Sequence, residues 1–375
     1  MDIDSDLDGG AIDVLDASDD RDVGLAIRGD VASDHRQWFH FRARADVGTQ
    51  RRFTIVNAGE ATFPQGFEGY RTCVSYDGEK WFRIPTEFDG EKLVFTHQAI
   101  RRDVLYAYFA PYTFGRHERL LGIAGRSKRA SLTELGRSIE GRPIHVVTIG
   151  TPREDRRTVW ITARQHPGET MAEWFADGLV ARLLDRRDSV ARALLERAVF
   201  HVVPNVNPDG GVLGNLRTNA VGQDLNRAWL EADPERAPEV ACIRGAMEET
   251  GVDLHLDVHG DERNPYVFAA GNEGNPSYSP RIEALEDEFG NWLEKLDPDF
   301  QREYGYPRDA PGEADLSTAA NWVGERFDCL ALTLEMPFKD AANHPRPMTG
   351  WSPERARGFG SRVLEAVFPM VGDLR

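Results

Sequence analysis

The segment "TVWITARQHPGETMAEWFADGLVARLLD", residues 158–185, combines a strand pattern with a helix pattern. Residues 158–164 form an apolar run of strand length, whereas residues 170–185 place apolar side chains at helical spacing. A short polar segment, "QHPGE", separates the two patterns. A strand that leads directly into a helix is the repeating unit of α/β domains, so this segment predicts an α/β fold for the region around it.

The chain beyond residue 143 repeats this alternation. We expect further strands at residues 144–150, 198–206, 252–260 and 329–337, and further helices at residues 238–250, 280–296 and 352–368. Strands and helices that alternate in this way form a mainly parallel or mixed sheet with helices on both faces. The carboxyl ends of such strands are where ligands usually bind.

The first 110 residues show a different pattern. Segments such as "QWFHFRAR" (37–44) and "KLVFTHQAI" (92–100) alternate apolar and polar residues, and Gly, Asp and Pro separate them. This pattern predicts an antiparallel β-sandwich. A chain of 375 residues is also long enough for two domains.

A helical pattern appears between these two regions. The segments "YTFGRHERLLGIAG" (112–125) and "SLTELGRSIEG" (131–141) both have helical spacing and capping residues. We therefore place the domain boundary here. The predicted β-sandwich domain covers residues 1–115, and the predicted α/β domain covers residues 116–375.

Charge and composition exclude several classes of function. A formal net charge of −17 argues against binding to nucleic acid or to an anionic membrane surface, because both need clustered Lys and Arg. No run of about 20 apolar residues is present to span a membrane. The three cysteines are too far apart for a zinc motif, and the Asp-rich start does not resemble a secretory signal. We therefore expect a cytoplasmic location.

Three residues have the pattern of a metal site. His166 and Glu169 follow the strand at 158–164, and His259 follows the apolar segment "LHLDV" (254–258). A histidine and a glutamate three positions apart on a helical turn share a face. Two histidines and one glutamate leave an open position on a zinc ion, as in catalytic sites. The HxxE pair alone is weak evidence; the combination with His259 carries the argument.

Polar groups suited to a carboxylate lie between these candidate ligands. The segment "VVPNVNPDGGVLGNLRTNAVGQDLNRAW" (202–229) contains Arg217, Asn226 and Arg227. A guanidinium group binds a carboxylate through two hydrogen bonds, and an amide can add a third, although most arginines form surface ion pairs. Glu335 lies at the end of the apolar strand in "LTLEMPF" (332–338), where a buried charge needs a reason.

These motifs resemble, in the same order, those of the M14 zinc metallocarboxypeptidases, and within them the cytosolic carboxypeptidase branch. The matching motifs are "HPGE", "NPDG", "GNLR", "DLNR", "DVHG" and the glutamate of "LTLEMPF". The resemblance covers the whole predicted α/β domain, and the first domain resembles the β-sandwich of that branch. It implies a carboxypeptidase-like mixed sheet with helices on both faces, preceded by an antiparallel β-sandwich domain.

The resemblance also implies a role for each candidate residue. His166, Glu169 and His259 would bind one zinc ion, and Asp224 would orient His166. The substrate would be the carboxyl terminus of a peptide or protein. Asn226 and Arg227 would bind its terminal carboxylate. Arg217 would polarise the scissile carbonyl, and Glu335 would act as general base toward the zinc-bound water.

Two departures from the family pattern concern the substrate pocket. The branch usually continues the third-ligand motif as HGH, whereas this chain has "HGDE". The family's mobile tyrosine has no clear counterpart, although Tyr304 and Tyr306 are nearby candidates. By resemblance, a terminal glutamate or aspartate is the expected preference. A pocket for it needs a basic residue, for which Arg308 and Lys339 are candidates.

Two other functions stay open at this stage. A zinc amidohydrolase of small N-acyl amino acids, similar to aspartoacylase, shares the HxxE and Asn-Arg motifs but usually has no β-sandwich in front. Alternatively, the chain is an inactive relative whose sandwich recruits a partner through the aromatic residues of "QWFHFRAR". Alternating aromatic residues in a strand are more often part of a core.

Overall fold

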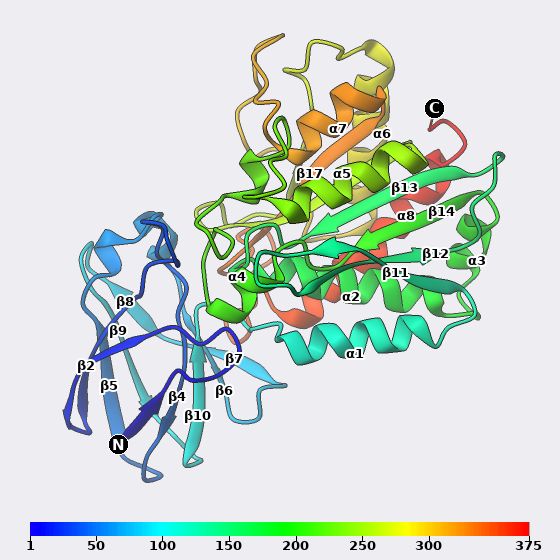
Figure 1. Cartoon of the computed structure of the whole chain (residues 1–375). Coiled ribbons are helices and arrows are strands. Elements are labelled where there is room, and N and C mark those ends of the chain that lie inside the picture. The colour runs from blue at the N-terminus through cyan, green and yellow to red at the C-terminus, as the bar shows by residue number, and fades with distance from the viewer. Residues whose placement is uncertain (375) are drawn as a thin grey trace.

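The computed structural model describes residues 1–374 and divides into a β-sandwich and an α/β part (Figure 1). The β-sandwich, coloured blue to cyan, lies beside the edge of the α/β part at which the parallel strands end. Within the described residues, no helix is both long and apolar enough to cross a membrane. The architecture is the predicted one: an antiparallel sandwich followed by a mixed sheet between helices.

Two five-stranded sheets form the β-sandwich. The first contains, in order, β1 (Asp2–Asp4), β4 (His40–Arg44), β10 (Asp103–Ala107), β6 (Thr72–Ser75) and β7 (Trp81–Ile84). The second contains β2 (Asp13–Asp19), β3 (Asp22–Ala26), β5 (Gln50–Ile55), β9 (Leu93–Gln98) and β8 (Thr86–Phe88), together with one parallel pair, β3–β5. Two 3₁₀ helices, η1 (Ala58–Glu60) and η2 (Pro64–Phe67), follow β5.

Aromatic side chains fill the space between these sheets. Phe41 stacks on Tyr106, and Phe53 stacks on Phe95 with ring centroids 5.0 Å apart. All four side chains are buried. The aromatic residues of "QWFHFRAR" therefore belong to the core, as expected for alternating residues of a strand with one buried face.

A seven-stranded sheet forms the centre of the α/β part. Its order is β11 (Ala130–Arg137), β12 (Pro143–Ile149), β14 (Ala198–Val203), β13 (Arg157–Ala163), β15 (Leu254–Asp261), β17 (Leu330–Pro337) and β16 (Phe268–Ala270). The four strands β14, β13, β15 and β17 are parallel, and the flanking strands are antiparallel to their neighbours. The parallel strands end at one edge, so the loops that follow them meet there.

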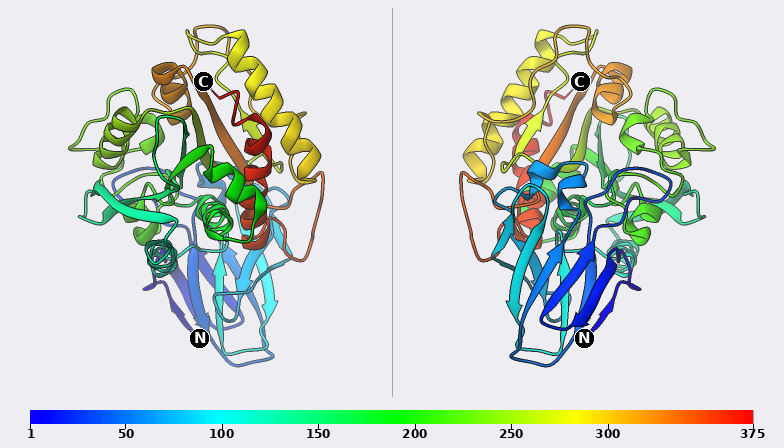
Figure 2. Two further views of the ribbon diagram at one scale, coloured as in Figure 1. Left: turned by 90° about the vertical axis from the view of Figure 1, so that its right-hand side faces the viewer. Right: turned by 90° about the vertical axis from the view of Figure 1, so that its left-hand side faces the viewer.

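Helices cover both faces of this sheet (Figure 2). Helices α1 (Phe114–Gly125), α2 (Thr170–Leu184), α3 (Ser189–Leu195), α6 (Pro280–Leu296) and α8 (Pro353–Met370) belong to the larger hydrophobic core. Helices α5 (Pro238–Thr250) and α7 (Ala319–Phe327) pack on the opposite face with Trp160 and Trp229. The short helices α4 (Pro208–Leu213) and η3 (Leu225–Arg227) lie in the loops.

Glycine allows α2 and α8 to cross at close range. A Cβ atom on Gly178 would lie 2.1 Å from the Arg357 carbonyl oxygen, and one on Gly360 would lie 2.1 Å from the Phe175 carbonyl oxygen. Each helix therefore presents a glycine to the backbone of the other. The close approach holds α2, whose amino-terminal end carries the site, firmly against the core.

One predicted element is wrong. Residues 131–141 have helical spacing, but the structure forms β11, which pairs with β12 from Ala130–Ile149 to Arg137–Pro143. Gly141, with φ of +83°, lies in the turn between these strands and does not end a helix. Pairing with β12 and the turn at Gly141 decide that this segment forms an edge strand. A local sequence pattern contains no information about either. The helix predicted at 112–125 is confirmed as α1.

Contacts across the interface connect the sandwich to the α/β part. Arg83 of β7 donates to the backbone oxygens of Phe338, Thr349 and Trp351. Tyr108 stacks on Phe338 with ring centroids 4.6 Å apart. The predicted domain boundary between residues 115 and 116 falls near the start of α1 and stays a prediction.

Candidate active site

A tight turn after β13 places the first two candidate ligands. His166 and Glu169 precede α2, and the Glu169 backbone N–H donates to the His166 carbonyl. Arg164 begins this turn with φ of +62°, an unfavourable value for a residue with a side chain. Its guanidinium group donates to the backbone oxygens of Pro167 and Tyr112, and these bonds hold the strained turn in place.

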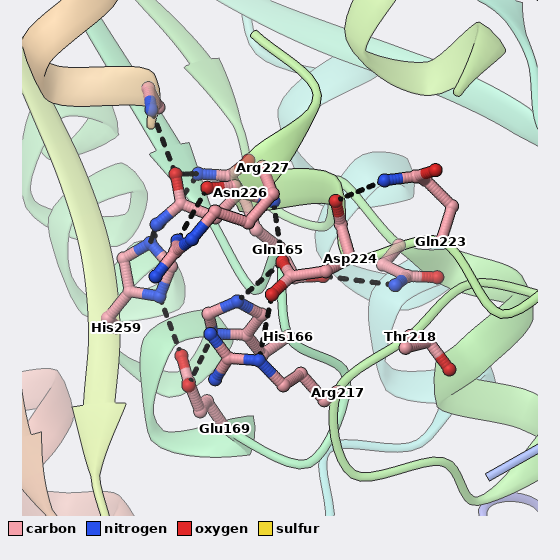
Figure 3. Close-up of polar contacts among 12 residues, drawn as sticks. Gln165, His166, Glu169, Arg217, Thr218, Gln223, Asp224, Asn226, Arg227 and His259 are labelled. Carbon is pink, nitrogen blue, oxygen red and sulfur yellow. Dashed lines mark hydrogen bonds and ion pairs between the residues drawn. The ribbon is translucent and has the colours of Figure 1, made fainter. Parts of the chain in front are cut away.

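The three candidate metal ligands converge (Figure 3). His166 Nδ1 lies 2.6 Å from Glu169 Oε1, and His259 Nδ1 lies 2.8 Å from Glu169 Oε2. The nearest donor atoms of the three residues all lie within 4.8 Å of one another, and all three residues are buried. Burial alone would raise the pKa of Glu169, but the two imidazoles lower it to about 2. The donors fit a zinc ion, which prefers imidazole nitrogen and carboxylate oxygen.

The other nitrogen of each histidine faces a carboxylate. His166 Nε2 lies 3.1 Å from Asp224 Oδ1, and His259 Nε2 lies 2.8 Å from Asp257 Oδ2. A carboxylate at Nε2 favours a proton there and leaves the Nδ1 lone pair free for a metal. Both imidazoles are thus oriented for binding a cation between them and Glu169.

Asp257 is a site residue that was not predicted from the sequence. It lies fully buried and accepts hydrogen bonds from Thr162 Oγ1 at 2.8 Å and Gln165 Nε2 at 2.7 Å. Burial alone would raise the pKa of Asp257, but His259 and the Thr162 hydroxyl group lower it. A signal was present, because residues two apart on a strand share a face, and Asp257 precedes His259 by two positions in "DVHG".

Glu335 lies beside the metal ligands. It is the register partner of His259 on the neighbouring parallel strand, so the two side chains share one face of the sheet. Its Oε1 accepts a hydrogen bond from the Tyr306 hydroxyl at 2.8 Å, whereas Oε2 has no hydrogen-bond partner among residues 1–374. Burial, together with the charges of Glu169 and Asp261, raises the pKa of Glu335. A carboxylate in this state readily accepts a proton.

Tyr306 is the tyrosine that reaches this carboxylate. Although 42% of the Tyr306 residue is exposed, loss of water around its hydroxyl group and the charges of Glu335 and Asp261 raise the pKa of that hydroxyl, so it stays protonated and donates to Glu335. Tyr304 stacks on Tyr266 instead. The sequence does not distinguish the two tyrosines, because both lie in an irregular loop where no periodicity indicates the direction of a side chain.

The three candidate substrate-binding residues line the same cleft as the metal ligands. Arg217 Nε donates to Asp224 Oδ2 at 2.8 Å, and its guanidinium group is largely buried. Asn226 is buried and its Oδ1 accepts from the first backbone N–H of α7. Arg227 is exposed at the mouth of the cleft. The structure thus brings together the three candidate metal ligands, Glu335, Arg217, Asn226 and Arg227 in one cleft.

The cleft has a volume of about 780 Å³ and is rich in carboxylates. Eleven of its lining residues are Asp or Glu, and five are Arg. In place of the second histidine of the HGH pattern, Asp261 and Glu262 form part of the wall. Arg308 lines the cleft 3.2 Å from Glu273, whereas Lys339 lies outside it and donates to the Glu68 backbone oxygen.

Comparison with known families gives two matches along the chain. Residues 3–109 match the cytosolic carboxypeptidase N-terminal domain, and residues 122–349 match the zinc carboxypeptidase domain. An uncharacterized protein of Zymomonas mobilis is 41% identical over 374 residues, which cover 100% of this chain and 97% of that protein. Cytosolic carboxypeptidase 2 of Danio rerio is 31% identical over 285 residues, which cover 67% of this chain and only 39% of that longer protein.

Solved structures match the whole chain. A metallo-carboxypeptidase of Pseudomonas aeruginosa, in complex with (2-guanidinoethylmercapto)succinic acid, is 48% identical with a TM-score of 0.97, and 100% of each chain is covered. A metallo-carboxypeptidase of Burkholderia cenocepacia is 44% identical with a TM-score of 0.96, and 99% of each chain is covered. Both domains and their arrangement are therefore shared with these proteins.

Proposed function

Because the chain belongs to the M14 zinc carboxypeptidase family, in its cytosolic carboxypeptidase branch, we propose that it removes the C-terminal residue of peptides or proteins in a zinc-dependent reaction. One observation carries this proposal: the buried His166, Glu169 and His259 converge beside Glu335, whose Oε2 has no hydrogen-bond partner in the described part of the chain. A cytoplasmic location, as in the names of the relatives, stays part of the same proposal.

The metal would be held by His166 Nδ1, His259 Nδ1 and the Glu169 carboxylate. A bound zinc ion supplies Lewis acidity, both to a water molecule and to the carbonyl of the scissile bond. Asp224 and Asp257 fix the two imidazoles from behind, so the ligands need little rearrangement to bind the ion.

Glu335 would handle the protons of the reaction. Its free Oε2 takes a proton from the attacking water and then delivers it to the leaving amine. The Tyr306 hydroxyl holds Oε1 and leaves Oε2 directed at the reacting atoms. The raised pKa of Glu335 supports this role, because a carboxylate with too low a pKa would not hold the proton between the two steps.

Arginine and amide groups would bind the substrate. Arg217, held by Asp224, stabilises the negative charge that develops on the scissile carbonyl oxygen. Asn226 and Arg227 bind the terminal carboxylate of the peptide. Because that carboxylate exists only at a chain end, these residues would restrict cleavage to the last peptide bond.

The preferred terminal residue has two candidates. A glutamate or aspartate is favoured by the family branch and by Arg308, which lines the cleft. A cationic residue is favoured by the excess of carboxylates in the lining and by the guanidino compound bound to the Pseudomonas aeruginosa relative. The overall charge of −17 also favours cationic substrates at long range.

A peptide screen tests the proposed function. Peptides that differ only in the last residue are incubated with the full chain, with and without a chelator, and released amino acids are measured. We expect release of single terminal residues that a chelator abolishes and added zinc restores. Release of glutamate or aspartate alone supports the first specificity, and release of lysine or arginine alone supports the second.

Two controls separate the alternatives. Glu335→Gln should lower kcat by about 10²–10⁴-fold without loss of bound zinc, because it removes only the proton acceptor. Hydrolysis of N-acetylaspartate without hydrolysis of any peptide would instead indicate an aspartoacylase-like amidohydrolase. A zinc-loaded chain that cleaves neither substrate class would indicate an inactive relative.

A further inference from the structure

One carboxylate of the β-sandwich, that of Asp30, contacts the loop that carries Arg217. Asp30 lies in the sandwich beyond β3, and it is 7% exposed although it carries a charge. Its partners are not arginines or lysines. They are the backbone N–H groups of the loop that carries Arg217, which belongs to the α/β part.

Asp30 receives three consecutive backbone donors of this loop. Its Oδ1 accepts from Leu216 N at 2.6 Å, and its Oδ2 accepts from Arg217 N at 2.8 Å and Thr218 N at 2.9 Å. The Thr218 hydroxyl group adds a fourth bond at 3.1 Å. Burial raises the pKa of Asp30, and these donors partly offset the rise. Successive N–H groups that point at one anion fix the backbone that carries them.

Neighbouring contacts hold the same loop against the sandwich. The Val31 backbone N–H donates to Asn215 Oδ1 at 3.0 Å. Gly222, at the far end of the loop, lies so close to Ala32 that a Cβ atom would come within 2.1 Å of the Ala32 carbonyl oxygen. The loop therefore rests on sandwich residues 30–32 along its length.

The side chain of Arg217 is held separately from its backbone. Asp224 binds Nε, and the Phe63 ring of the sandwich lies 6.0 Å from the guanidinium carbon. Asp30 fixes the main chain from which this side chain extends. An arginine that stabilises charge on one particular oxygen must have both its main chain and its guanidinium group fixed. A displacement of about 1 Å can reduce the rate about a hundredfold.

We propose that Asp30 is a positioning residue, through which the β-sandwich domain sets the place of Arg217 in the active site. This inference rests on the role proposed for Arg217. It assigns to the first domain a part in catalysis: the sandwich completes the site, although the metal ligands and Glu335 all come from the α/β part.

The test measures the effect of Asp30→Asn in two backgrounds, the wild-type chain and the Arg217→Ala variant. Asp30→Asn keeps the shape of the side chain but turns an amide N–H₂ group toward backbone donors, so the loop must shift. We expect kcat to fall about tenfold to a hundredfold, with KM and bound zinc close to the wild-type values. Arg217→Ala alone should lose more, and adding Asp30→Asn to it should cause little further loss, because the two residues act as one unit.

Two further variants make the test specific. Asp8→Asn changes another sandwich carboxylate, which accepts from the Phe114 backbone N–H at the start of α1 and from no N–H group of the Arg217 loop that the structure describes, and should leave kcat unchanged. Thr218→Val removes only the hydroxyl bond to Asp30 and should lower kcat in the same direction by a smaller factor. It decides the question if Asp30→Asn fails to fold.

The outcomes separate this inference from the proposed function. A zinc-loaded Asp30→Asn variant with wild-type kcat overturns it, as does an equal loss in the presence and absence of the Arg217 side chain. A loss that appears equally in Asp8→Asn also overturns it, because the effect would then be general destabilisation. If the wild-type chain cleaves no peptide at all, the proposed function has failed instead.

Discussion

Two carboxylates stand behind the two candidate metal-binding histidines, one on each. Asp224 and Asp257 come from different elements, yet each meets an Nε2 atom and leaves Nδ1 facing Glu169. The orientation of the ligands therefore depends on residues that would not touch the ion. Substitution of such a partner typically lowers metal affinity by about 10–100-fold.

Asp257→Asn tests this dependence. A neutral amide stabilises a proton on His259 Nε2 less than a carboxylate does, so we expect zinc affinity to fall about 10–100-fold in competition with a chelating indicator. Asp253→Asn is the matched control, because Asp253 binds the Thr158 backbone N–H at the other end of the same sheet region. It should reduce stability and leave zinc affinity unchanged. Equal affinity in the Asp257 variant and the wild type would contradict the prediction.

At this scale the sequence was informative where residue type and motif coincided. His166, Glu169, His259 and Glu335 could be named because their chemistry and order match a known pattern. Tyr306 could not be chosen over its neighbour, since a loop has no periodicity from which a side-chain direction follows.

At the scale of the elements, the contact between α2 and α8 depends on two positions that have no side chain. Gly178 and Gly360 each face a carbonyl oxygen of the partner helix. Glycine is normally unfavourable inside a helix by about 1 kcal/mol relative to alanine. Here close packing outweighs helix propensity.

Gly178→Ala should therefore destabilise the protein. The added methyl group has no space, and forced overpacking costs about 1–3 kcal/mol, more than the gain in helix propensity. Urea unfolding of zinc-loaded protein measures the free energy of unfolding. Gly358→Ala in α8 is the control, because its Cβ would meet only the flexible Arg362 guanidinium group. It should be neutral or slightly stabilising; the same loss in both variants would refute the packing argument.

Most regular elements could be predicted, and the failures have a common cause. The helices at 238–250 and 280–296 have the predicted ends, because proline starts and apolar spacing agree there. Strand β11 was expected as helix, since its pairing with β12 and the turn at Gly141 outweigh the local pattern. The short elements α7 and β16 were not foreseen, because each is held by long-range packing rather than by its own sequence.

On the scale of the whole molecule, Arg83 is a main link between the two parts. Its buried guanidinium group donates to three backbone carbonyl oxygens across the interface and forms no ion pair with a carboxylate of residues 1–374. Hydrogen bonds from a charged donor contribute about 1.5–3 kcal/mol each, and the carbonyl groups would lose them together.

Arg83→Met should lower the free energy of unfolding by about 3 kcal/mol or more. Calorimetry of the full chain measures the change as a lower Tm. Arg44→Met is the matched control, because Arg44 forms ion pairs with Asp2 and Asp103 at the surface, where water screens them and they contribute little to stability. If the two variants melt at the same temperature, the interface bonds of Arg83 do not stabilise the assembly.

The presence of two domains could be predicted from the sequence, but not the contacts between them. The bond between Asp30 and Leu216 joins residues 186 positions apart, and neither segment carries a pattern that refers to the other. Sequence periodicity describes each element in its own neighbourhood. Which loop of one domain rests on which loop of the other is decided only when both have folded.

Asp30 and the loop at 215–218 are also synthesised in a fixed order. Translation starts at the amino terminus, and the ribosome releases the sandwich strands well before it makes the loop that will rest on them. The receiving carboxylate is then already in place as each new amide emerges. A circular permutant that began with the α/β part would reverse this order and would have to shape its arginine loop without a template.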